Sequence, residues 1–81
     1  MNKKEILSQA LTQRDDEILN YQVNIDNYTR AIEKINNEHK DNEKLEPFLN
    51  NLYDLLDSSK LEQLKSIIIR DVIQDQLREL D

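Results

Sequence analysis

Apolar residues recur every three or four positions along the first half of the chain and form a heptad pattern. In a/d notation, the a positions hold Leu or Ile, the d positions hold Leu, Tyr or Ile, and Arg14 is the exception at d. The apolar and tyrosine members of this seam are Leu7, Leu11, Ile18, Tyr21, Ile25, Tyr28, Ile32 and Ile35. A seam of about four heptads predicts a long helix over residues 3–39 that packs on another helix.

The heptad pattern stops at a polar stretch, residues 40–46, which we interpret as a connection. Pro47 follows it and suits the first turn of a new helix, where a backbone N–H is not needed. Leucines then recur at three- and four-residue steps, so a short helix is predicted over residues 47–57.

Ser58 and Ser59 suggest where that short helix ends. The run Ser59-Lys60-Leu61-Glu62 matches a capping box, in which the Ser and Glu side chains accept from free backbone N–H groups. A third helix is therefore expected over residues 60–80. An uninterrupted helix over residues 47–80 stays open as an alternative, because neither serine forbids it.

The last twenty residues are more apolar than a surface helix requires. One apolar arc of about 100° is enough to cover a core. Here two adjoining arcs are present: Leu61, Leu64, Ile68 and Val72 in one, and Ile69, Ile73, Leu77 and Leu80 in the other. We expect one arc to pack on the first helix and the other on a second copy or a partner. The residues assigned to self-association are Ile68, Ile69, Val72 and Ile73.

These patterns predict one all-α domain over residues 1–81: a long helix, with the short and medium helices folded back as an antiparallel, coiled-coil-like hairpin. The 81 residues contain no Gly, one Pro and no Cys, which fits long helices and excludes disulfides. A core this small usually needs another source of stability, so we expect a homo-oligomer, with a dimer favoured.

Composition also limits the chemistry that the chain can perform. No Cys and a single His, His39, argue against a transition-metal site, and no motif for catalysis or for a cofactor is present, so we expect no enzyme. A formal net charge of -6 disfavours direct binding to nucleic acid. Because no apolar run is long enough for a membrane span or a secretory signal, we expect a cytoplasmic protein without membrane contact.

Two seam positions allow more than one interpretation. Arg14 could pair across the seam with an acid of a neighbouring helix, such as Asp15, Asp71 or Asp75, or its stem could cover the seam with the guanidinium in water. The seam tyrosines, in turn, suit either contact with a foreign helix or the edge of the core.

His39 suits either a pH-sensing role or a solvated position at a helix C-terminus. Tyr53 lies off the leucine stripe of the short helix, which makes it a candidate for an outward contact.

Acidic residues account for the remaining candidates. Asp15 and Asp16 are adjacent, and Asp71, Asp75 and Glu79 follow one another at steps of four on one helix face. Such rows are either a solvated surface or an imitation of a phosphate backbone.

The sequence therefore supports a function in protein–protein binding, as an accessory, adaptor or inhibitor protein of the small bacterial or phage type. Two alternatives stay open. One is a structural or assembly factor that forms a helical bundle, and the other is an acidic mimic that inhibits a DNA- or RNA-handling protein.

Overall fold

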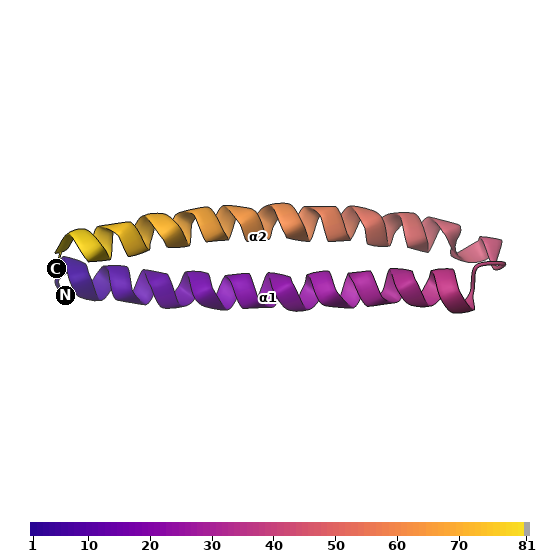
Figure 1. Cartoon of the computed structure of the whole chain (residues 1–81), viewed down its shortest axis with the longest axis horizontal. Helices are drawn as coiled ribbons and strands as arrows, with labels where there is room; N and C mark the ends of the chain where they lie inside the picture. Colours follow the sequence, from indigo (N-terminus) through magenta and orange to yellow (C-terminus); the bar gives the residue numbers. More distant parts are fainter. Residues whose placement is uncertain (81) are drawn as a thin grey trace.

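Two long helices lie side by side and antiparallel in the computed structural model, which describes residues 1–80 (Figure 1). Helix α1 spans Lys3–Glu38, a short 3-10 helix η1 spans Glu43–Leu45, and helix α2 spans Glu46–Leu80. Both ends of the chain lie at one end of the hairpin, and the connection lies at the other (Figure 1). The predicted all-α hairpin is confirmed.

Local signals fix where α1 begins and where α2 starts. The Asn2 side chain accepts a hydrogen bond from the Glu5 backbone N–H at 2.9 Å, which satisfies one free donor of the first turn of α1. After α1, the Asn42 side chain accepts from the Lys44 backbone N–H at 3.2 Å and starts η1. Pro47 lies in the first turn of α2, as its missing N–H favours.

The α1 seam faces α2 of the same chain. Each of the eight apolar or tyrosine seam residues is buried or half-buried, and Ile25, Ile32 and Ile35 are the most enclosed of them. With 36 residues rising about 1.5 Å each, α1 accounts for most of the 58 Å length of the molecule.

The predicted division of the second half into helices 47–57 and 60–80 is corrected, because α2 is continuous from Glu46 to Leu80. Serine lowers helix stability by only a fraction of a kcal/mol, so Ser58 and Ser59 do not end a helix that packs on α1 on both sides of them. The structure therefore has the uninterrupted helix that the sequence left open.

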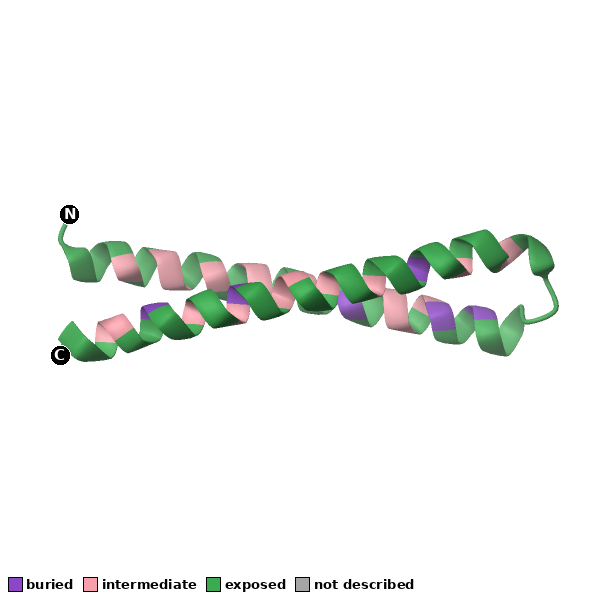
Figure 2. Cartoon of the chain, turned by 90° about the horizontal axis from the view of Figure 1, so that it is seen from above, coloured by how far each residue is buried: buried purple, intermediate pink, exposed green. Residues whose placement is uncertain are grey.

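The face of α2 that contacts α1 keeps the steps of three and four residues through both serines. Its buried or half-buried residues are Leu49, Leu52, Leu56, Ser59, Gln63, Ser66, Arg70, Ile73 and Leu77, and Leu45 of η1 precedes them at the same spacing. The two ends of this face are apolar, whereas its centre is polar. Figure 2 shows the buried residues as small areas where the two helices meet, with most of the remaining surface exposed.

The main core lies near the closed end of the hairpin. Ile32, Ile35 and Leu52 form it, and Leu52 is the most enclosed apolar residue, with 4% of its surface exposed. Tyr28 and Leu49 pack against this cluster. The position of Tyr28 is therefore that of a core-edge residue.

Candidate functional site

The middle of α2 presents most of its apolar residues to solvent, whereas Gln63 and Ser66 contact α1. Leu61, Leu64, Ile68, Ile69 and Val72 are between 41% and 54% exposed. We call these five residues the α2 stripe. They are neighbours on the helix surface, because residues three and four apart lie one turn above each other.

At the level of the stripe, the interface between the helices is held by hydrogen bonds. The Gln63 amide donates to the Ile18 carbonyl oxygen at 3.2 Å and to Gln22 Oε1 at 2.9 Å. The Gln22 amide in turn donates to Asp26 Oδ1 at 3.0 Å. Gln63 is thus a cross-helix anchor in a position where a heptad seam normally holds an apolar side chain.

A second polar contact joins the helices through Glu17. Glu17 Oε2 accepts from Arg14 Nη1 at 3.0 Å and from Ser66 Oγ at 3.1 Å. Ser66 is buried, and Arg14 and Glu17 are each about one-third exposed. Arg14 therefore pairs with an acid of its own helix, not with Asp15, Asp71 or Asp75, and Glu17 carries the link to α2.

We expect Gln63→Ala to lower the free energy of unfolding by about 1–2 kcal/mol, because two cross-helix hydrogen bonds, one of them partly buried, are lost together. Gln74→Ala, the same change at an exposed position of α2, is the matched control and should shift it by less than about 0.5 kcal/mol. Guanidinium denaturation followed by circular dichroism measures both. Equal losses in the two variants would contradict the role of Gln63.

The self-association residues named from the sequence divide into two groups. Ile68, Ile69 and Val72 belong to the exposed α2 stripe, whereas Ile73 is 7% exposed and packs within the hairpin. One apolar arc of the helix thus contacts α1 at Ile73 and Leu77, and the other remains on the outside.

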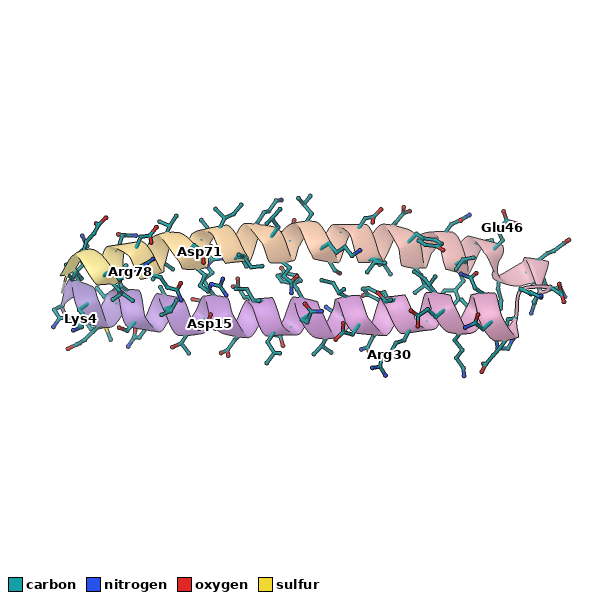
Figure 3. The ribbon with its side chains drawn as sticks, viewed as in Figure 1. Lys4, Asp15, Arg30, Glu46, Asp71 and Arg78 are labelled. Atoms are coloured by element: carbon teal, nitrogen blue, oxygen red, sulfur yellow. The ribbon has the colours of Figure 1, made fainter. Side chains whose placement is uncertain are left out.

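The acidic candidates lie on the surface of both helices. Asp15 and Asp16 are exposed on α1, and Figure 3 shows Asp15 and Asp71 on different helices. Asp71 pairs with Arg70 at 3.0 Å and Asp75 pairs with Arg78, while Glu79 is exposed. The row on α2 is therefore interrupted by cations of the same helix.

Tyr53 is 45% exposed near the closed end, beside the core but outside it. At the same end a shallow hollow is lined by Ala31, Lys34, Ile35, His39, Asn42, Leu45 and Phe48. His39 is exposed and caps α1 through its backbone N–H, which donates to the Ile35 carbonyl oxygen at 2.9 Å.

At the end of α1, Glu38 forms an ion pair that shifts the pKa of its carboxyl group. Lys34 Nζ lies 2.8 Å from Glu38 Oε2, and this hydrogen bond, followed by the attraction of the Lys34 charge, lowers the pKa of Glu38. The pKa of Glu38 is lower in the folded chain than in the unfolded chain. The Lys34–Glu38 pair therefore stabilises the fold at pH values above the unfolded pKa. That contribution is lost as the pH falls through the folded pKa, and it is small because both groups are exposed.

We expect Lys34→Gln to raise the pKa of Glu38 toward its ordinary value, measured by NMR titration of the carboxyl carbon. Lys60→Gln removes a lysine from the middle of α2 and serves as the control. An unchanged Glu38 pKa in the Lys34 variant would show that the ion pair does not persist in solution.

Among residues 1–80, no cluster of three or more His, Asp or Glu side chains is arranged to hold a metal ion. Neither α1 nor α2 has a stretch that is apolar enough to cross a membrane. No buried side-chain nitrogen or oxygen of the described part of the chain lacks a hydrogen-bond partner. Apolar residues are exposed on α1 as well, at Ile6, Leu19 and Val23, but the α2 stripe gathers five of them as neighbours on one helix surface.

Comparisons of the chain with models of protein families, with curated proteins and with solved structures found no match. The class of the molecule is defined by its fold and surface: an antiparallel helical hairpin with a polar central interface and an exposed apolar stripe.

The contacts that join the two helices through Glu17, Gln63 and Ser66 were not predicted from the sequence. The signal for the two α2 residues was present, because continuing the steps of three and four from Leu52 and Leu56 reaches Gln63 and Ser66. The presumed break at Ser58-Ser59 interrupted that count.

Proposed function

We propose that the chain is a non-enzymatic cytoplasmic protein that acts by protein–protein binding, and that the α2 stripe is its contact surface. The observation that carries this proposal is the reversed arrangement in the middle of α2. Apolar side chains face solvent there while Gln63 and Ser66 face α1. A hairpin that acted alone would gain stability from the opposite arrangement.

Burial of the stripe provides a substantial driving force. Full burial of one Leu, Ile or Val side chain is worth about 1.5–3 kcal/mol, so the five half-exposed side chains supply roughly 5 kcal/mol. The stripe is the outer surface of one helix, which suits packing on another helix or in a helical groove. An accessory, adaptor or inhibitor role follows from such a surface.

The acidic row gives less support to nucleic-acid mimicry. A mimic needs carboxylates that remain available to a basic groove, whereas Asp71 and Asp75 are each paired with an arginine of α2. An assembly factor would use the same stripe, and would be distinguished by weak contacts with many clients.

A photo-crosslinking amino acid tests the proposal in the native cell. We expect benzoylphenylalanine at position 68 to give one discrete crosslinked protein product on illumination. Position 6 is the matched control, because Ile6 and Ile68 are the same residue type with 53% and 54% exposure. Absence of a discrete product at position 68, or the same product at both positions, would contradict a binding role for the stripe.

A further inference from the structure

We propose that the partner covering the α2 stripe is a second copy of this chain, with the two α2 helices packed antiparallel about a two-fold axis. This inference rests on the proposed binding function and names its partner. Two-fold dimers use the same surface patch on both subunits, so the patch must be complementary to itself. The stripe meets this requirement in its spacing, its charge and its size.

Together with Lys65, which lies among them, the stripe residues keep the same spacing when their direction is reversed. Place the two-fold axis beside the midpoint of residues 66 and 67. Leu61 then lies opposite Val72 of the other copy, Leu64 lies opposite Ile69, and Lys65 lies opposite Ile68. Each apolar residue of the stripe thus has a partner across the axis, and Lys65 is the one polar member of the paired set.

Lys65 fits this arrangement as a rim residue. Its aliphatic stem can cover Ile68 of the other copy while its ammonium group stays in water. One helical turn from that contact lies the other copy's Asp71, which is exposed and whose Oδ1 is paired with Arg70 of its own helix, so Lys65 would have to share this carboxylate. In the single hairpin Lys65 pairs with Glu62 of its own helix at 2.9 Å, and because both side chains are exposed the ammonium group can exchange this partner for an acid of the other copy.

The surface of the hairpin also matches the needs of a dimer. A compact monomer of 9.7 kDa exposes about 5,100 Å². This chain exposes 6145 Å². The excess of roughly 1,000 Å² is close to the share of about 800 Å² that each partner buries in a standard interface. The excess follows from the elongated shape of 58 × 17 × 14 Å, and burial of one such share would bring the exposed area close to that of a compact protein.

Solution mass tests the dimer. Light scattering behind a sizing column should give the mass of two chains at high micromolar concentration. In Ile68→Glu we expect a monomer with unchanged helical circular dichroism, and a dissociation constant raised about a hundredfold or more, since the change enters a two-fold interface twice. Ile6→Glu, at equal exposure on α1, should stay dimeric. A wild-type monomer up to millimolar concentration, or a dimeric Ile68→Glu, would overturn the inference.

Disulfide trapping tests the direction of the helices. The chain has no cysteine, so Leu61→Cys and Val72→Cys are each unique sites. Mixed and oxidised, the two variants should form a disulfide-linked heterodimer, whereas each alone should not crosslink. Within one chain the two positions are about 16 Å apart along the helix, beyond disulfide reach. Crosslinking of each variant with itself, and not with the other, would overturn the antiparallel arrangement.

These experiments separate the inference from the proposed function. If the wild-type chain is monomeric but position 68 crosslinks to a different protein, the stripe binds a partner and only the second copy is excluded. If position 68 gives no product at all, the binding function itself fails.

Discussion

Leu52→Ala should lower the free energy of unfolding by about 3 kcal/mol, because truncating an enclosed leucine removes buried apolar surface and leaves a cavity. Leu52 is 4% exposed and joins Ile32 and Ile35 in the main core cluster. A chain of this size rarely gains more than about 3–5 kcal/mol from its core, so the variant should keep at most about 2 kcal/mol and should unfold at a much lower temperature than the wild type. Thermal unfolding followed by far-ultraviolet circular dichroism measures the loss.

Leu19→Ala is the matched control for this effect. Leu19 is the same residue type, but it is 63% exposed on α1. We expect its change to stay within about 0.5 kcal/mol of the wild type at the same protein concentration. If both leucines cost the same, the core does not lie where α1 and α2 meet near the closed end.

Ile73→Asp should be at least as disruptive, with an expected loss of about 4 kcal/mol. Ile73 is buried between the helices, so the substitution removes apolar contacts and places a carboxylate in a buried apolar position. We expect the helical signal at room temperature to fall toward that of an unfolded chain.

Ile69→Asp tests the border between the buried and the exposed side of α2. Ile69 lies four residues before Ile73 and belongs to the exposed stripe. This variant should keep its helical circular dichroism while losing the association that depends on the stripe. Unfolding by Ile69→Asp and tolerance of Ile73→Asp would mean that the buried face of α2 is centred on Ile69 and not on Ile73.

The first helix and its packing face follow directly from the sequence. Ile25, Ile32 and Ile35 repeat at heptad spacing, and a helix that buries one apolar stripe must place them against another helix. The connection could also be predicted, because a polar run followed by Pro47 breaks one helix and favours the start of the next.

The centre of the interface was harder to predict. Apolar residues normally identify the buried face, yet in the middle of α2 the buried face carries Gln63 and Ser66 while Ile68 is exposed. Burial is decided there by the register set at the two apolar ends of α2, by residues such as Leu52 and Ile73. Residues 60–72 by themselves do not show this register, because the apolar residues that set it lie outside that range.

Glu17 illustrates a different limit. The sequence shows Arg14 in the seam and acids nearby, but which carboxylate it contacts depends on side-chain conformations within α1. Glu17 lies three residues away on the same helix face and also reaches Ser66, so a single oxygen serves both groups. The predicted partners Asp15, Asp71 and Asp75 were sought only on a neighbouring helix, so Glu17 of the same helix was not among them.

Isoleucine methyl NMR with a soluble paramagnetic agent tests the central claim most directly, because the stripe and the core both contain isoleucines. The signals of Ile32 and Ile73 should survive at every protein concentration, and that of exposed Ile6 should be bleached throughout. Ile68 and Ile69 should be bleached in dilute protein and protected as the concentration rises. Bleaching of Ile68 as complete as that of Ile6 at all concentrations would contradict an associating stripe.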